Sequence, residues 1–366
     1  MGTAIVTGAA GQDGYYLVRR LAAEGVHVHA VIRARGSASG IDRIAGPGSV
    51  TVHELDINDA PGHERLLAQV RPDEFYNLAG LSSVSASFLE PNTTWRTNAD
   101  AVQALLEAVR TVSPLTRFYQ SSSTEMFGAE PGEAITNDEG SRFMPQSPYA
   151  AAKAAAHLAC DAYRRTYGLR TAAGILSNHE SRRRAPGFLT RKVVDHVRML
   201  RRLGTDHLDD VAPLAVGNLA ARRDWGFAPD YVDGMVRVIR QIEVRARTLR
   251  LPADADVGAS YRDYVLGSGR LHAVWQLVDR AFALAGLALD WDRSDPDPAS
   301  WAATFRTTGG PAIVVDPTFI RPTDPAAIRA DPAKARRELG WRPPTGLDRF
   351  LADMLDASDD ELATHR

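Results

Sequence analysis

TGAAGQDG, residues 7–14, is the stretch of sequence that decides the fold, and it directly follows the short apolar run TAIVT. Gly8, Gly11 and Gly14 form a G-x-x-G-x-x-G pattern that lies before an amphipathic segment. Glycines at this spacing let the backbone turn tightly and approach a pyrophosphate, which the N–H groups at the start of a helix attract. The same spacing occurs in ordinary tight turns, but the strand–turn–helix context favours dinucleotide binding.

Outward from this turn, the first 175 residues alternate between short apolar runs and longer amphipathic stretches. The apolar runs predict strands at residues 3–7, 26–32, 50–55, 74–78, 117–121 and 171–176. The amphipathic stretches predict helices at residues 15–24, 60–70, 99–112 and 149–167. Strands that alternate with helices of this length form βαβ units, so we expect a parallel sheet covered on both faces.

The pattern changes after residue 177, where polar, arginine-rich and proline-rich segments become common. Residues 230–242 and 264–269 nevertheless read as a helix and a strand that return to the sheet. We therefore predict an α/β fold: a doubly wound parallel (Rossmann) sheet with a smaller, mostly C-terminal substrate domain. The nucleotide-binding domain would comprise residues 1–177 plus about 220–269, and the substrate domain about 178–219 plus 270–366.

Composition excludes several classes of protein. The 366 residues are 44% hydrophobic and 24% charged, which is ordinary for a globular chain. A net charge of −2, from 43 basic and 45 acidic residues, gives no argument for a nucleic-acid partner. Cys160 stands alone and cannot form an intrachain disulfide, and no apolar run suits a membrane span or signal peptide. We expect a cytoplasmic protein with no membrane or nucleic-acid partner and no metal site.

The end of the second predicted strand indicates the type of dinucleotide. A carboxylate there would hold the ribose 2′-hydroxyl of NAD, whereas this chain has Arg33 and Arg35. Two arginines suit a 2′-phosphate, so NADP is the predicted cofactor, although both are also compatible with a solvated surface. Asp56, after the third strand, either accepts a hydrogen bond from the adenine amine or caps the following turn.

Tyr149 and Lys153 are four residues apart on a predicted helix and therefore share a face. A nearby ammonium is expected to lower the pKa of the phenol, so that the tyrosine acts as a base toward an alcohol. Lysine is rare in this chain: the 43 basic residues include only Lys153, Lys192 and Lys334. Ser123 follows the fifth strand, at the sheet edge where ligands bind, and can hydrogen-bond a substrate oxygen.

Glu125 lies two residues beyond Ser123 in the segment SSSTEMFG. Oxidation of an alcohol needs only the serine, the tyrosine and the lysine. A second carboxylate is needed when an acidified C–H proton beside a new ketone must also be removed. The alternative for Glu125 is a solvated loop acid.

Several ordered motifs together resemble the extended short-chain dehydrogenase/reductase family, and within it the GDP-mannose 4,6-dehydratases. They cover most of the chain: TGAAGQDG, EFYNLAG, FYQSSSTEMFG, PQSPYAAAK, GILSNHES, FLTRK, GNLAARRDWGFAPDYVDGM, IRPTD and AKARRELGW. The resemblance implies a nucleotide-sugar substrate and a homodimer or homotetramer, formed in part through the arginine loop after the second strand.

The resemblance also implies roles for individual residues. The catalytic set would be Ser123, Glu125, Tyr149 and Lys153. The cofactor would be held by Gly8, Gly11, Gln12, Asp13, Gly14, Arg33, Arg35, Asp56, Leu78, Tyr149, Lys153, His179 and Arg184. The substrate would be held by Asn178, Lys192, Arg223 and Arg321.

The implied reaction is an internal redox cycle on a hexose. Tyr149 takes the C4 hydroxyl proton while hydride leaves C4, and the new ketone acidifies C5–H. Glu125 removes the C5 proton and helps protonate the departing 6-hydroxyl, after which hydride returns to C6. The cofactor ends as it began.

Some positions depart from the family pattern. Leu81 and Ser83 replace the usual glutamine and histidine, Thr93 replaces a tyrosine, and Arg182 enters the segment ESRRRAPG. Asp324 stands where the family has glutamate. We infer that the reaction class is retained, a 4,6-dehydration of GDP-mannose or a related GDP-sugar, while these changes leave open a different sugar, a different base or both. A heptose or an antibiotic sugar fits equally well. The alternatives are a nucleotide-sugar epimerase or reductase on the same scaffold, or an NADP-binding regulator without catalysis.

Overall fold

The computed structural model describes residues 2–34, 40–41, 49–129, 134–249, 261–320 and 325–358. Its main sheet has seven strands: β1 (Thr3–Thr7), β2 (His27–Ile32), β3 (Val50–Glu54), β4 (Glu74–Asn77), β5 (Arg117–Ser123), β7 (Thr171–Leu176) and β11 (Tyr264–Leu266). Their order is β11-β7-β5-β4-β1-β2-β3, and all neighbours are parallel. The chain runs from β1 out to β3 and then returns past β1 to β11. This confirms the predicted doubly wound sheet.

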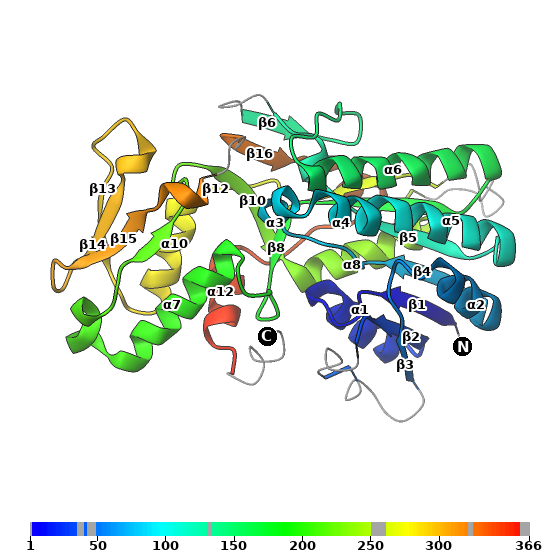
Figure 1. Ribbon diagram of the computed structural model, residues 1–366, viewed down its shortest axis with the longest axis horizontal. Coiled ribbons are helices and arrows are strands. Elements are labelled where there is room, and N and C mark those ends of the chain that lie inside the picture. The colour runs from blue at the N-terminus through cyan, green and yellow to red at the C-terminus, as the bar shows by residue number, and fades with distance from the viewer. Residues whose placement is uncertain are drawn as a thin grey trace.

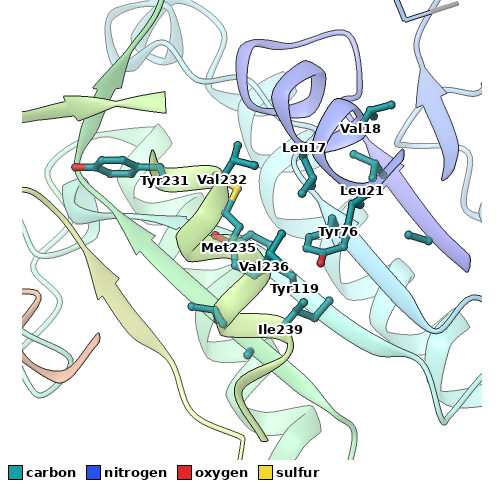
Figure 2. Close-up of a cluster of buried hydrophobic side chains, with 14 of the residues drawn as sticks. Leu17, Val18, Leu21, Tyr76, Tyr119, Tyr231, Val232, Met235, Val236 and Ile239 are labelled. Carbon is teal, nitrogen blue, oxygen red and sulfur yellow. The ribbon is translucent and has the colours of Figure 1, made fainter. Parts of the chain in front are cut away.

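Helices cover both faces of this sheet, as Figure 1 shows. One face packs against α1 (Gln12–Ala23) and α8 (Ala228–Ile239), and the other against α2 (Ala60–Val70), α5 (Ala101–Val112) and α6 (Pro148–Tyr167). Figure 2 shows Leu17 and Leu21 of α1 pointing toward Tyr76 of β4, with α8 beside them. Burial of these apolar side chains fixes α1, and hence the glycine turn, against the sheet.

The remaining strands form two smaller sheets, and the remaining helices pack either on these sheets or on helices and strands of the main sheet. A sheet ordered β12-β10-β16-β6, with β8 also paired to β10, lies beside a four-stranded sheet ordered β13-β14-β15-β9. The strands are β6 (Ala134–Asn137), β8 (Asn178–Glu180), β9 (Leu214–Val216), β10 (Arg222–Phe227), β12 (Leu271–Ala273), β13 (Leu289–Asp292), β14 (Ala302–Phe305), β15 (Pro311–Val315) and β16 (Ala327–Ala330). The helices are α3 (Val84–Leu89), α4 (Pro91–Trp95), α7 (Leu189–Leu203), α9 (Gln241–Leu249), α10 (Val274–Leu284), α11 (Ala333–Glu338) and α12 (Leu347–Leu355).

A second hydrophobic cluster joins α7, α10 and α12 to the sheet of β13, β14, β15 and β9, at the end of the molecule away from α2 in Figure 1. The predicted division into two domains stays a prediction. Ala335, Leu339 and Trp341, which we assigned to the substrate domain, pack in the first cluster, where Trp341 meets Tyr231 edge to face. Within the described ranges, no helix is both long and apolar enough to cross a membrane.

Element boundaries moved by a few residues for local reasons. The helix expected from residue 99 begins as α5 at Ala101, because a π-helical turn (Arg96–Asp100) precedes it. The strand expected at 264–269 ends at Leu266, and Gly269 adopts a positive φ of 76°. Strand β5 extends two residues further than expected, to Ser123. This extension carries the chain directly into the catalytic segment.

Candidate active site

The glycine turn after β1 has no space for side chains. Gly8 has a φ of +66°, and a Cβ on Gly14 would lie 2.2 Å from the carbonyl oxygen of Gly8. Helix α1 begins after Gly11 without a side-chain cap on its first N–H groups. Because those N–H groups have no intrahelical partner, they can bind an anion. The turn therefore fits the pyrophosphate of a dinucleotide.

A partly buried ion pair holds this turn against the segment that follows β7. His179 Nε2 lies 2.9 Å from Asp13 Oδ2, and its Nδ1 lies 2.7 Å from the carbonyl oxygen of Ser177. Gln12 Nε2 donates to the carbonyl of His179 at 2.9 Å. Burial opposes the imidazolium, but the Asp13 carboxylate outweighs it, so the pKa of His179 is raised. The pKa of Asp13 is lowered despite its burial, because His179 faces it.

Behind this pair lies a buried polar cluster that the sequence analysis missed. Tyr231 stacks on His179 with ring centroids 4.5 Å apart and shares a hydrogen bond of 2.6 Å with Ser177. Asp224 accepts hydrogen bonds from the N–H and hydroxyl of Ser268, at 2.9 and 2.6 Å. Burial raises the pKa of Asp224. The signal was present in the motif RRDWGFAPDY, which supplies both Asp224 and Tyr231 but was read only for its arginine.

The adenosine end of the predicted cofactor site carries two arginines. Arg33 lies just beyond β2. It lines the large cavity that also contains the glycine turn. Arg96, which the sequence analysis did not single out, lines this cavity too. The backbone N–H of Asn58 donates to Asp56 Oδ1 at 2.8 Å and holds the pKa of Asp56 low, with Arg33 and Arg96 adding to the effect. Asp56 thus caps the following turn and also lines the cavity. Arg35 lies outside the described residues.

Helix α6 presents Tyr149 and Lys153 to the same cavity. Ser147 caps the helix through the N–H of Ala150, at 3.0 Å, which sets where its first turn begins. Lys153 Nζ donates to the carbonyl of Ser121 at 3.0 Å and lies 5.9 Å from the centre of the Tyr149 ring. Ser123 lies on the same cavity wall and acts to lower the pKa of Tyr149.

The expected lowering of the tyrosine pKa is wrong for the protein alone. Burial raises the pKa of Tyr149 to about 12, and the negative charge of Glu125 adds to this effect. Burial also lowers the pKa of Lys153 to about 8, because the ammonium loses hydration. Desolvation therefore outweighs the attraction between phenolate and ammonium, since both groups lie inside the cavity wall.

The catalytic cavity, of about 720 Å³, brings together most of the predicted site. Glu125 is half-buried, follows β5 in a short 3₁₀ helix and lines this cavity rather than facing bulk solvent. The cavity wall holds these predicted residues: Gly8, Gly11, Gln12, Asp13, Gly14, Arg33, Asp56, Leu78, Ser123, Glu125, Tyr149, Lys153, Asn178, His179 and Arg184.

Two predicted substrate residues lie outside the wall of that cavity in the part of the chain described. Lys192 Nζ lies 3.7 Å over the Phe319 ring. Arg223 is buried and donates to the carbonyl of Pro325 at 2.9 Å. Arg321 lies outside the described residues, although Arg223 anchors the chain just after it. Their roles remain predictions.

This geometry can be compared with known proteins. A family model described as GDP-mannose 4,6 dehydratase matches residues 5–354. GDP-mannose 4,6 dehydratase 1 of Arabidopsis thaliana is 35% identical over 98% of this chain and 90% of its own length. The GDP-mannose 4,6-dehydratase of Vibrio cholerae serotype O1 is 33% identical over 99% of this chain and 95% of its own. The chain belongs to the GDP-mannose 4,6-dehydratase family.

Membership of this dehydratase family confirms the predicted reaction class, nucleotide-sugar 4,6-dehydration, and the prediction that the protein is an enzyme. Solved structures support the fold. DesIV, a dTDP-glucose 4,6-dehydratase from Streptomyces venezuelae, matches with a TM-score of 0.70 and 24% identity, over 96% of this chain and 95% of its own. A UDP-glucose-4-epimerase from Stenotrophomonas maltophila reaches a TM-score of 0.74 at 20% identity, over 97% of each chain.

The departures from the dehydratase family pattern divide into two groups. Leu81, Ser83 and Thr93 all line the catalytic cavity, and Ser83 also caps α3 through the N–H of Ala86. Arg182 instead pairs with Asp353 of α12, with the closer N···O distance at 2.6 Å. Asp324 lies outside the described residues. The first group changes the surface that a bound ligand meets, whereas Arg182 ties the site segment to the C-terminal helix.

Proposed function

We propose that this enzyme is an NADP-dependent 4,6-dehydratase of a GDP-hexose, with Ser123, Glu125, Tyr149 and Lys153 as its catalytic residues. One observation carries the proposal: a phenol, an ammonium and a separate carboxylate line a single cavity that is continuous with the glycine turn. An alcohol dehydrogenase needs no such carboxylate. Both curated relatives described above carry the name of GDP-mannose dehydratases, which supports a GDP-sugar as substrate.

A nicotinamide dinucleotide fits the residues present. DesIV was solved with NAD, and the glycine turn here leaves no room for a Cβ where a pyrophosphate would approach. Arg33 and Arg96 favour the phosphorylated form, because a guanidinium binds phosphate by charge-assisted hydrogen bonds. When bound, the oxidised nicotinamide supplies a hydride acceptor and a positive charge, and its reduced form returns the hydride.

The first step is proton removal from the C4 hydroxyl of the sugar. Ser123 lines the same cavity as Tyr149, acts to lower its pKa and can orient the C4 oxygen toward the phenol. Tyr149 must lose its own proton to act, and its pKa of about 12 means that the empty site holds the neutral phenol. Positive charge brought in by the cofactor, together with the Lys153 ammonium, favours the phenolate when the ligands assemble. The protein therefore activates its base on binding.

Elimination of water follows from the 4-ketone. The ketone acidifies C5–H, and Glu125 takes this proton as a carboxylate. The same carboxyl then protonates the C6 oxygen, which leaves as water while a C5–C6 double bond forms. The hydride removed from C4 would return to C6, and C5 would gain a proton in exchange for the one that Tyr149 took from the C4 hydroxyl. This completes the 4-keto-6-deoxy sugar and restores both Tyr149 and Glu125 to their starting states.

The remaining substrate contacts are proposed from the family resemblance. Asn178 lines the cavity beside His179 and would contact the sugar or the diphosphate. The family resemblance assigns Lys192, Arg223 and Arg321 to the nucleotide part of the substrate. A homodimer or homotetramer in the cytoplasm accords with the family resemblance.

The decisive experiment incubates the enzyme with GDP-mannose and NADP and measures product mass. We expect loss of one water and appearance of a carbonyl; a product of unchanged mass would indicate epimerisation instead. Parallel incubations with GDP-heptoses test whether Leu81, Ser83 and Thr93 mark a different sugar. Failure of every GDP-sugar to lose water overturns the proposal.

Glu125→Gln tests the role of the carboxylate. We expect turnover to fall about a thousandfold, the scale of a lost general acid–base group, while C4 oxidation still gives enzyme-bound NADPH absorbance. Glu64→Gln, an exposed acid on α2, is the matched control and should leave turnover unchanged. Loss of both the absorbance and turnover in Glu125→Gln would contradict a specific role in elimination.

A further inference from the structure

A second cavity, of about 850 Å³, lies apart from the catalytic cavity. It is formed by β10, β12, the start of α10, α11 and the loop that leads into α12. Among the described residues, no side chain lines both cavities. We call it the arginine groove, and no step of the dehydration uses it.

The arginine groove is strongly positive. Its wall holds five arginines and only two aspartates. Asp348 already pairs with Arg280 through two N···O contacts of 2.9 and 2.6 Å, and Asp279 accepts a hydrogen bond from the indole of Trp291 at 2.9 Å. The whole chain carries a net charge of −2, so this excess is local.

Three of the five arginines are available to a ligand. Arg270, Arg342 and Arg349 are exposed, and within the described part of the chain no acid pairs with them. Arg336 is held by the carbonyl of Ser268, to which it donates at 3.1 Å. Guanidinium groups gathered without counter-ions repel one another, which an anion would relieve.

The groove also has an aromatic wall. Trp225 and Trp275 both line it, although Trp225 is only 6% exposed and Arg293 already lies 3.8 Å over the Trp275 ring, so they present an apolar wall more than two open ring faces. Indole faces pack against planar rings and against apolar parts of a ligand. A bare inorganic anion would use the arginines but not these two side chains. The volume lies in the range of sites that hold nucleotide-sized ligands.

We propose that the arginine groove binds a nucleoside polyphosphate, with its phosphates on Arg270, Arg342 and Arg349 and its base against the tryptophans. This binding is separate from the proposed dehydratase reaction and does not depend on it. The groove is a second nucleotide site in a chain whose first cavity already takes a dinucleotide.

The test counts nucleotide equivalents in the loaded enzyme. With saturating NADP present, and GDP left out because it would itself compete for the groove, ATP is titrated by calorimetry, and we expect one equivalent per chain that depends on the groove arginines. Arg342→Ala/Arg349→Ala should weaken this binding at least tenfold. The control Arg19→Ala/Arg65→Ala removes the same charge from exposed positions on α1 and α2 and should bind ATP like the wild type.

Dehydratase activity and circular dichroism of the double variant should match those of the wild type, because both arginines are exposed and outside the catalytic cavity. Absence of the extra equivalent in the wild type would overturn the proposal, as would equal ATP binding by the Arg342→Ala/Arg349→Ala variant. Inorganic tripolyphosphate is the second probe. If it binds as tightly as ATP, the base has no part in recognition and the nucleotide assignment is wrong.

Discussion

The catalytic cavity has two halves that are built differently. In the cofactor half, Gly8 and Gly14 touch backbone directly, and the Asp13–His179 pair fastens the turn to the segment after β7. In the substrate half, Glu125 sits in a short 3₁₀ helix, and the wall continues through Gly187 and Phe188, which precede α7. The cofactor half is therefore assembled before any ligand arrives, whereas the substrate half depends on loops.

The two halves differ because different elements supply their walls. The cofactor half is set by the ends of neighbouring parallel strands, whose order the sheet fixes. The substrate half draws on segments from the second hydrophobic cluster, such as α7, whose position depends on long-range packing. Substitutions in the two halves should therefore have different effects. Those among the proposed catalytic residues should lower turnover, and those in the cofactor half should weaken NADP binding.

Tyr149→Phe should show the largest difference between its effect on turnover and its effect on NADP binding. Removing the phenol hydroxyl deletes the base but leaves the glycine turn and Arg33 untouched, so NADP should bind as before. We expect turnover to fall about a thousandfold, since general base groups contribute on that scale. Single-turnover kinetics with a parallel NADP titration measures both effects. Weakened NADP binding in this variant would show that the two halves are not separate.

Gly14→Ala should damage the cofactor half directly. The new Cβ would lie 2.2 Å from the Gly8 carbonyl oxygen and 2.6 Å from Ala9 Cα, so backbone must shift. We expect at least tenfold weaker NADP binding and a loss of about 3 kcal/mol in the free energy of unfolding. Gly346→Ala is the control, because no atom lies within 4 Å of its added Cβ. Normal NADP affinity in Gly14→Ala would contradict the close fit of the turn.

The fold could be read from the sequence because its elements are local and periodic. Helix α2 and strand β7 occur at the predicted residues, and the alternation of strands and helices dictated a parallel sheet. What periodicity did not reveal was packing across the chain. Trp341 joins the first cluster from far along the sequence, and no local pattern marks which core an aromatic residue enters.

The residues of the site also fall into those that could be predicted from the sequence and those that could not. The glycine pattern and the Tyr149–Lys153 pair can be recognised in the sequence, because each consists of residues at a fixed spacing within one short segment. Arg96 and Asp224 cannot be recognised in this way, because the residues that they contact are distant in sequence and are brought near only by the fold. The tyrosine pKa shows the limit most clearly: proximity to a lysine can be read from spacing, but the desolvation that outweighs it requires knowledge of burial.

Asp13→Asn should loosen the cofactor half by a smaller amount. The raised pKa of His179 adds stability that is full below its ordinary value of 6.5 and is lost as pH rises through the folded-state pKa. The lowered pKa of Asp13 adds stability above its ordinary value of 3.8, which is lost as pH falls through the folded-state value. The variant should therefore lose most stability between those two pH values, by about 2 kcal/mol.

Urea unfolding at pH 5.5 and pH 9 checks this dependence. The difference between wild type and Asp13→Asn should shrink as pH rises through the folded-state pKa of His179, because the imidazolium that Asp13 stabilises is then lost. Asp73→Asn gives a comparison, because that carboxylate only accepts the N–H of Thr3, at an exposed position. A constant difference across pH would mean that the two side chains are not an ion pair.

The smallest effect should come from Arg33→Ala, which touches neither the turn nor the catalytic residues. Because Arg33 is exposed at the rim of the cavity, its attraction for a 2′-phosphate is partly screened by salt. We expect about tenfold weaker NADP binding with NAD affinity unchanged, and a smaller difference at high ionic strength. Arg96→Ala should act in the same direction, since both guanidiniums act on Asp56.

Arg19→Ala is the matched control for this preference, because it removes an exposed charge from α1 outside the cavity. If Arg33→Ala weakened NAD and NADP equally, the arginine would be supporting the adenosine generally and the argument for a 2′-phosphate would fail. If only the Arg33→Ala/Arg96→Ala double variant lost the preference, the two guanidiniums would be redundant. The cofactor half would then owe its specificity to their combined charge rather than to one contact.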